Sequence, residues 1–111
     1  MSGSLTTPRL RTGSLARALT RLLGADAVTL GTRVFLSSTA AREVSAKTEA
    51  GTRLLRHELA HVSQFAVEGT ARFLWKYALS YARGRRLGLS HSAAYLEIPY
   101  EREAREAEER S

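Results

Sequence analysis

The sequence predicts a small α+β domain in which a short β-sheet or hairpin packs on one long helix. Three observations predict this class. A stretch rich in β-branched and aromatic residues comes early, at 27–37; helical periodicity follows over residues 52–67 and 70–83; and Pro99 marks the start of a last helix. The chain has 111 residues, 43% of them apolar, which suits one hydrophobic core. We therefore expect a flexible leader over residues 1–12 and a single domain over residues 13–111.

The first half of the chain predicts one helix and one hairpin. Residues 1–12 are rich in Ser, Thr and Arg, a composition typical of a flexible terminus. An apolar stripe at helical spacing predicts a short amphipathic helix, with Ser14 as its N-cap and Gly24 at its end. That stripe consists of Leu15, Ala18, Leu19 and Leu22. Gly31-Thr32 divides residues 27–37 as a two-residue hairpin turn would, which predicts a hairpin or one bent strand. Residues 37–51 are small and polar and predict a loop with room for one helical turn.

The second half is mainly helical. The main helix is predicted over residues 52–67, where Leu55, Leu59, Val62 and Ala66 form one apolar stripe. Another helix is expected over residues 70–83, with its aromatic side chains in the core and Gly84 at its end. Residues 84–98 lack a regular pattern, and we expect them to be irregular, to stay out of the core and to border or cover a cleft. Pro99, at a first helical position, begins the final acidic helix.

The charge distribution and the hydropathy of the sequence indicate which classes of binding partner to expect. The formal net charge is +6, but residues 97–111 carry six acidic and three basic residues, whereas residues 1–96 carry five acidic and fourteen basic ones. The densest basic spot, residues 83–86, is not flanked by a set of aromatic residues that could stack on successive bases, which argues against a nucleic-acid partner. No apolar run approaches the roughly 20 residues of a membrane span, and the first residues lack the hydrophobic segment of a secretory signal. We expect a cytoplasmic protein with no membrane partner; the oligomeric state is not predicted.

One motif carries chemistry, His57-Glu58-x-x-His61, on the predicted main helix. The two histidines are one turn apart, so their imidazoles project the same way and can ligate one metal ion. The chain has no cysteine, so a transition-metal site must use His and carboxylates. Zinc would leave an open position for water, and the Glu58 carboxylate could accept the proton of that water as it attacks a polarised carbonyl. The alternative is an ordinary amphipathic helix whose histidines face solvent or form hydrogen bonds with neighbouring side chains.

The residues alone leave the third metal ligand open. An extended motif would place a third histidine six residues after His61, where the chain has Val67. His91 lies in the irregular segment, and Glu68 is expected to point away from the site. In the last helix Tyr100, Ala104 and Ala107 form the inward stripe, and two carboxylates flank it on opposite sides. The remaining candidates are therefore His91, Glu97, Glu101, Glu103 and the acidic residues after Glu103.

These residues resemble the gluzincin branch of zinc metallopeptidases. The segments "LGTRVFLS" and "GTRLLRHELAHVSQ" are especially similar to the small HELxHVxQ domain found among extracellular contractile injection system proteins and related bacterial metallopeptidases. The likeness spans about residues 25–64, with a weaker similarity at "YLEIPYEREA", residues 95–104. It implies a minimal zincin-like fold, in which the edge strand of a small sheet lies beside the helix that carries both histidine ligands.

The resemblance also implies roles for single residues. Glu101-Arg102-Glu103-Ala104 is similar to the family's Glu-x-x-Ala, which implies Glu101 as the third zinc ligand beside His57 and His61. The expected activity is zinc-dependent cleavage of a peptide or protein substrate, with water as the nucleophile and Glu58 as the general base. The alternative is a non-catalytic or latent binding or regulatory module with the same fold. Apart from the resemblance, Tyr95 and Tyr100 lie near this last helix, and a phenol could stabilise the oxyanion, although the sequence favours core packing for each.

Overall fold

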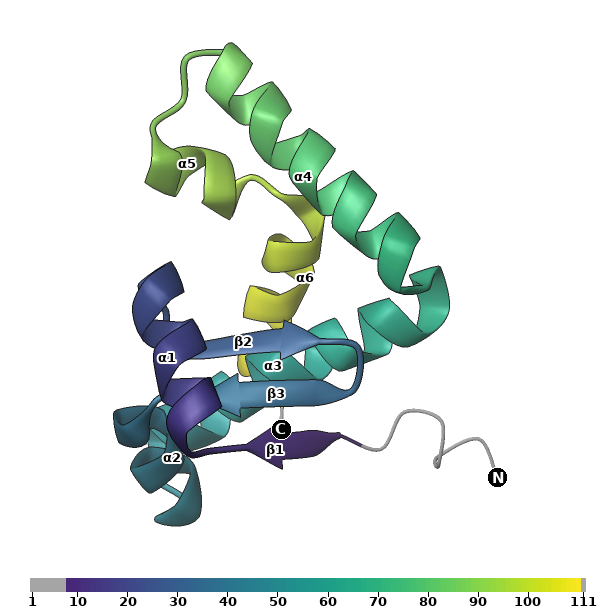
Figure 1. Ribbon diagram of the computed structural model, residues 1–111. Helices are drawn as coiled ribbons and strands as arrows, with labels where there is room; N and C mark the ends of the chain where they lie inside the picture. The colour runs from purple at the N-terminus through teal and green to yellow at the C-terminus, as the bar shows by residue number, and fades with distance from the viewer. Residues whose placement is uncertain (1–7, 111) are drawn as a thin grey trace.

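Residues 8–110 are described by a computed structural model of the chain, and they form a three-stranded sheet and six helices (Figure 1), which confirms the expected α+β class. The elements, in chain order, are β1 (Arg9–Arg11), α1 (Ser14–Leu23), β2 (Ala27–Leu30), β3 (Arg33–Leu36), α2 (Ser38–Ser45), α3 (Glu49–Glu68), α4 (Thr70–Arg86), α5 (His91–Leu96) and α6 (Pro99–Glu108). None of the helices among these residues is long and apolar enough to cross a membrane.

The sheet has the strand order β1-β3-β2, with β1 parallel and β2 antiparallel to β3. The predicted hairpin is confirmed, because β2 and β3 are joined by Gly31-Thr32. Gly31 has φ 64°, a left-handed conformation that glycine adopts without steric cost. β2 therefore forms one edge of the sheet, on the side where α3 passes.

The prediction that residues 1–12 form a flexible leader is wrong for residues 9–11, which form strand β1. Its residues pair with β3 in parallel register, Leu10 lying opposite Val34. Backbone N–H and C=O groups form this ladder, so exposed polar side chains do not prevent it. Residues 1–7 of the expected leader lie outside the described residues.

The core lies on both faces of β3. Val34, Phe35 and Leu36 are all buried, although successive side chains of a strand point to opposite faces. In Figure 1, α1 crosses the near side of the sheet and α3 runs behind it. Val34 and Leu36 form a buried cluster with Ala40 of α2 and Val62 of α3. The strand is therefore buried between helices, and its continuous apolar run reflects that position.

Helix α1 forms where expected but is rotated relative to the predicted stripe. Ala16 and Thr20 are buried, whereas Leu15 and Leu22 are exposed. The small Ala16 and the Thr20 hydroxyl, which donates to the Ala16 carbonyl at 2.8 Å, allow close packing on the sheet. The N-cap residue is Gly13 rather than the predicted Ser14, and Gly24 ends the helix in a left-handed conformation.

The loop predicted over residues 37–51 contains all of α2 and the first turn of α3. Two side-chain caps account for this: Ser37 Oγ accepts a hydrogen bond from Ala40 N at 3.1 Å, and Thr48 Oγ1 accepts one from Gly51 N at 3.0 Å. A Cβ at Gly51 would lie 2.3 Å from the Glu43 carbonyl oxygen. Gly51 therefore permits the close approach of α2 to α3 and does not mark a loop.

Helix α4 continues through Gly84, so the predicted stop is wrong. Gly84 is buried, and a Cβ there would lie 2.9 Å from the Cβ of Ala94 in α5. The segment predicted to be irregular, residues 84–98, includes α5, whose N-cap is Ser90. Ala94 and Ile98 are almost completely buried. The expectation that this segment stays outside the core is wrong, because it packs between α4 and α6.

Candidate metal centre

The packing of α6 on α3 builds the site. Helix α3 buries both His57 and His61, at 8% and 6% exposure. The actual inward face of α3 is centred on the motif, while Ala66 of the predicted stripe is exposed. On α6, Glu101 and Ala104 are the buried residues. The small side chain of Ala104 lets α6 approach α3 closely and brings Glu101 against both imidazoles.

Three side chains converge on one point. His57 Nε2 lies 2.9 Å from Glu101 Oε1, and His61 Nε2 lies 3.2 Å from Glu101 Oε2. One ligand atom from each of the three residues lies within 4.8 Å of the other two. Ligand atoms at about 2.0–2.2 Å from a tetrahedral zinc ion are about 3.3–3.6 Å from one another. A small movement of the Glu101 carboxylate away from the two imidazoles would therefore make room for an ion. Two imidazole nitrogens and a carboxylate are donors that suit zinc.

A carboxylate holds the far side of the first imidazole. His57 Nδ1 lies 2.6 Å from Glu108 Oε2, and an ionised carboxylate can only accept, so Nδ1 carries the proton. Arg56 donates to the backbone carbonyl of Glu108 at 3.0 Å, which helps to fix that residue. Nε2 is thereby left facing Glu101, as a metal ligand requires.

A glutamine holds the second imidazole. His61 Nδ1 lies 2.8 Å from Gln64 Oε1. Gln64 Nε2 donates to the Tyr100 carbonyl at 3.1 Å and to Glu103 at 2.9 Å, which fixes the orientation of the amide. The amide oxygen must then accept from His61, so Nε2 of this ring also faces Glu101. Glu108 and Gln64 therefore orient the two histidine rings through the Nδ1 atoms, on the side of each ring away from Glu101.

The electrostatics of the cluster suit a cation. Burial lowers the pKa of both histidines, but it is outweighed by their hydrogen bonds, first of all to Glu101, and by the charges of Glu58 and Glu101. Each histidine pKa is therefore raised. Burial raises the pKa of Glu101, but His57 and His61 outweigh it and hold that pKa well below its usual range. Glu101 is therefore an ionised carboxylate buried between two imidazoles. A metal ion would replace the ring protons that compensate its charge.

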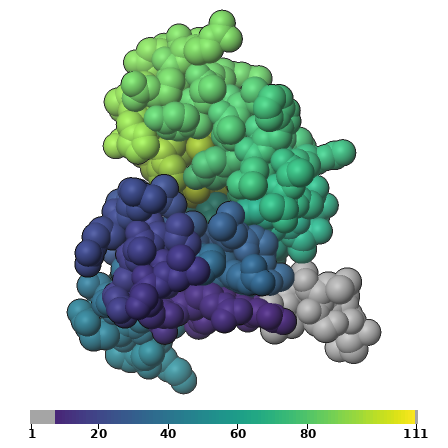
Figure 2. All heavy atoms as spheres, viewed as in Figure 1, coloured from purple at the N-terminus to yellow at the C-terminus, as the bar shows by residue number. Residues whose placement is uncertain are grey.

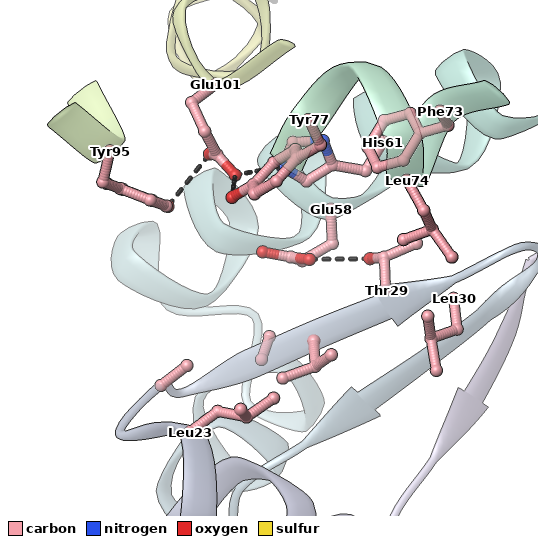
Figure 3. Close-up of a pocket in the computed structure, with 13 residues that line it drawn as sticks. Leu23, Thr29, Leu30, Glu58, His61, Phe73, Leu74, Tyr77, Tyr95 and Glu101 are labelled. Atoms are coloured by element: carbon pink, nitrogen blue, oxygen red, sulfur yellow. Dashed lines mark hydrogen bonds and ion pairs between the residues drawn. The ribbon is translucent and has the colours of Figure 1, made fainter. Parts of the chain in front are cut away.

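Glu58 lies beside the cluster and is buried, at 6% exposure. Its Oε1 accepts a hydrogen bond from the Thr29 hydroxyl of β2 at 2.7 Å (Figure 3). Glu58 also lines the cleft next to His61. The edge strand therefore holds the carboxylate that the sequence predicted as a general base.

Two phenols reach Glu101 from the other side of the cleft. Tyr77 of α4 donates to Oε2 at 2.7 Å, and Tyr95 of α5 donates to Oε1 at 2.9 Å (Figure 3). Burial and then the charge of Glu101 raise the pKa of both phenols, so they remain neutral donors. Tyr100, the other predicted oxyanion candidate, stacks on Phe73 at 4.5 Å between ring centroids and does not line the cleft.

The cleft opens between the sheet and α4. Figure 2 shows the surface hollowed between the blue segment around β2 and the green segment of α4 and α5, with yellow atoms of α6 at the back. Its volume is about 390 Å³. Apolar side chains form much of its walls: Leu23, Ala25, Ala27, Val28, Leu30, Phe73 and Leu74. The polar groups are those already described, so the candidate site lies at the bottom of a largely apolar cleft. Tyr95 makes the segment 84–98 border this cleft, as expected.

The other ligand candidates lie elsewhere. His91 is bonded to Tyr81 at 2.9 Å, Glu97 is the C-cap of α5, Glu68 pairs with Lys76 at 3.2 Å, and Glu103 accepts from Gln64. Only Glu101, of the candidates that the sequence left open, is brought to His57 and His61.

Four residues of the site were not predicted. Glu108 follows Glu101 by seven residues and Gln64 follows His61 by three, spacings that place each pair on one helix face and could have indicated them. Thr29 and Tyr77 come from elements distant in the sequence. No local pattern marks either residue.

A comparison with known protein families finds a match for the first part of the chain. Residues 1–68 match the family model of the eCIS core domain, where eCIS denotes the extracellular contractile injection system. The matched region contains the whole His57-Glu58-x-x-His61 motif and ends before α4, so Glu101 lies outside it. Neither the curated proteins nor the solved structures contain a match. Because the match covers 68 of 111 residues, the chain belongs to the eCIS core domain family.

Proposed function

We propose that the chain is a zinc metallopeptidase of gluzincin type. The observation that carries this proposal is the convergence of His57, His61 and Glu101 beside Glu58 at the bottom of an open cleft. Among the described residues the cluster offers three ligands and not four. Structural zinc sites are usually closed by four protein ligands, whereas catalytic sites keep one position open. The donor set therefore favours a catalytic site.

His57, His61 and Glu101 would hold the ion. When bound there, zinc would polarise the scissile carbonyl and lower the pKa of a water molecule. The chain itself supplies orientation, since Glu108 and Gln64 fix the two imidazole rings before any ion arrives.

Glu58 would move the proton. It accepts a proton from water as the water oxygen attacks the carbonyl carbon, and it delivers that proton to the amine nitrogen as the C–N bond breaks. Thr29 donates to one of its oxygens, which leaves the other free to accept. Burial beside the cleft keeps this carboxylate close to the reacting atoms.

Tyr77 would act as the electrophile. Its hydroxyl reaches Glu101 from the cleft side, and its raised pKa keeps the proton that a hydrogen-bond donor needs. A phenol in this position can donate to the carbonyl oxygen as negative charge develops there.

The cleft favours an extended peptide as substrate. β2 has a strand partner on one side only among the described residues, so a peptide can pair along its other edge. The apolar walls, formed by residues such as Val28, Leu30 and Leu74, can receive apolar side chains of that peptide.

The decisive experiment is Glu58→Gln. The amide keeps the shape but cannot take a proton, so peptide cleavage should fall by roughly 10²–10⁴ while zinc content and melting temperature stay near wild type. Glu49→Gln is the matched control, because Glu49 is an exposed residue of the same helix. It should change neither cleavage nor zinc content.

Two results would overturn the proposal. Negligible zinc in the purified protein, with no rise in melting temperature on adding zinc, would remove the metal centre. If wild type and Glu58→Gln hold zinc and neither cleaves any member of a peptide library, the non-catalytic module becomes the preferred function.

A further inference from the structure

Helix α4 and the segment after it carry an unusual charge balance. Residues 69–96 contain no acidic residue and five cationic ones: Arg72, Lys76, Arg83, Arg85 and Arg86. Residues 1–25 also lack acidic residues and carry four arginines, whereas basic and acidic residues are interspersed between residues 26 and 68 and after residue 96. In Figure 1, α4 runs along the outside of the molecule, away from the sheet.

One side of α4, which we call the outer face, combines apolar and cationic side chains. Trp75, Leu79 and Ala82 follow one another at spacings of four and three, so they share this side of the helix. Trp75 is 66% exposed and Leu79 is 45% exposed. The cations of the same face are Arg72, Lys76, Arg83 and Arg86. Arg83 and Arg86 line a shallow surface hollow together with Leu79 and Ala82, which places charged and apolar groups side by side.

The outer face is separate from the proposed catalytic cleft. The opposite side of α4 carries Phe73, which stacks on Phe65, and Tyr77, which donates to Glu101 of the candidate site. Gly84 lies on the same side and contacts α5. Trp75 and Leu79 line no part of the cleft. The exposure of the outer face therefore has no explanation in the proposed reaction.

The charges of this face are largely uncompensated. Lys76 pairs with Glu68 at 3.2 Å, but within residues 8–110 Arg72, Arg83 and Arg86 form no ion pair. Like charges at helical spacing repel one another. A negatively charged surface would relieve that repulsion, while a second copy of the same face would increase it.

We propose that the outer face of α4 docks on an anionic phospholipid membrane surface. Indole and leucine side chains partition into the interface between headgroups and acyl chains, and arginines beside them reach the phosphates. Mobile anionic lipids can gather under the four cations whatever their spacing, and each cation near such a surface adds attraction. A nucleic acid would satisfy the cations but leave Leu79 against a polar backbone. Docking needs no spanning segment, so it agrees with the absence of one among the described helices, but it departs from the expectation that the chain has no membrane partner.

The chain carries its own reporter for this docking. Trp75 is the only tryptophan, so tryptophan emission, excited selectively over the four tyrosines, comes from the outer face. Titration with phosphatidylcholine vesicles that contain phosphatidylglycerol should shift the emission to the blue, and brominated lipids should quench it. Pure phosphatidylcholine vesicles should do neither. Raising the salt from about 0.01 M to 1 M, which shortens the Debye length from about 30 Å to 3 Å, should release the protein.

Matched variants separate a specific face from general charge attraction. Arg83→Glu with Arg86→Glu should weaken vesicle binding by at least about tenfold. Arg17→Glu with Arg21→Glu makes the same change in net charge on exposed positions of α1 and should have a much smaller effect. Glu58→Gln should bind vesicles as wild type does, because docking does not depend on catalysis.

Three outcomes would overturn the proposal. The first is an unchanged Trp75 emission on anionic vesicles at low salt. The second is an equal loss of binding in the two charge-reversed pairs. The third is quenching by a DNA oligonucleotide, or a shift with polyglutamate, under conditions in which the vesicles have no effect.

Discussion

His57 and Glu108 are joined by a 2.6 Å hydrogen bond, and Glu108 lies two turns after Glu101 on the same helix, so α6 contacts both nitrogens of one imidazole. Glu101 approaches Nε2, where a metal would bind, and Glu108 holds Nδ1. A carboxylate on the far nitrogen of a metal-bound histidine orients the ring and makes it a stronger donor.

Glu108→Ala should weaken zinc binding about 10–100-fold, because the ring loses its orientation while all three ligands remain. Competition with a chromogenic chelator measures the affinity. Glu106→Ala is the control, an exposed acidic residue of the same helix. Equal affinities of the two variants would show that Glu108 does not support His57.

Glu101→Ala should lose zinc far more completely than Glu103→Ala. Glu101 is buried against both imidazoles, whereas Glu103 is exposed and bonded only to Gln64. Elemental analysis should find about one zinc per chain in wild type and in Glu103→Ala, and almost none in Glu101→Ala. Zinc retained by Glu101→Ala and lost from Glu103→Ala would reverse the assignment.

Thr29→Val should lower kcat by roughly tenfold with little change in zinc content, because it removes the hydroxyl that holds Glu58 and keeps the β-branched shape. Thr29→Ser restores the hydroxyl and should recover most of the activity. The comparison needs steady-state kinetics on one peptide. A Thr29→Val enzyme as active as wild type would mean that Glu58 is oriented by other groups.

Tyr77→Phe should lower kcat by about 10²–10³ and leave KM nearly unchanged, if its hydroxyl stabilises charge that develops only in the transition state. Tyr81→Phe removes a hydroxyl one turn later in α4 that bonds His91 instead, and it should leave kcat unchanged. A larger loss in Tyr95→Phe than in Tyr77→Phe would transfer the role to Tyr95.

Metal-stripped protein should lose stability as the pH rises above 6.5. Folding raises the pKa values of His57 and His61, so their contribution to stability is complete below the ordinary histidine value of 6.5 and disappears as the pH passes through the raised values. The pKa of Glu101 is lowered, so its contribution is present above 4.5 and is lost only in stronger acid. The free energy of unfolding should therefore be largest between these two values.

Zinc should reverse this trend, because it binds neutral imidazoles and competes with protons. Thermal melts with a chelator and with zinc, from pH 5 to 8.5, provide the test. The two curves should diverge as the pH rises. A melting temperature of the stripped protein that increases between pH 6.5 and 8.5 would contradict the ion network described for the cluster.

Secondary structure was predictable at positions where the backbone preference of a single residue decides the local conformation. Gly31-Thr32 predicts the hairpin turn because glycine adopts its left-handed conformation freely, and Pro99 predicts the start of α6 because its ring suits a first helical position. Gly84 was wrongly predicted to end a helix, and Gly51 fell within a wrongly predicted loop, for the opposite reason. Each permits a close contact with another segment, and such a contact leaves no local pattern.

The sequence by itself determined which potential metal ligands and which carboxylate lie together on one helix. In the motif of α3, the spacing of His57 and His61 places two imidazoles on one face with Glu58 adjacent, because 3.6 residues make a turn. The choice of Glu101 over Glu97, Glu103 or His91 required the similarity to a known family, since periodicity left these candidates open.

Only the tertiary structure decided which distant groups meet the motif. The packing of α6 on α3 brings Glu101 and Glu108 to opposite nitrogens of His57, while the edge strand brings Thr29 to Glu58 and α4 brings Tyr77 to Glu101. The physical reason is that helical periodicity tells which residues of one helix share a face. It does not tell which other element that face will contact.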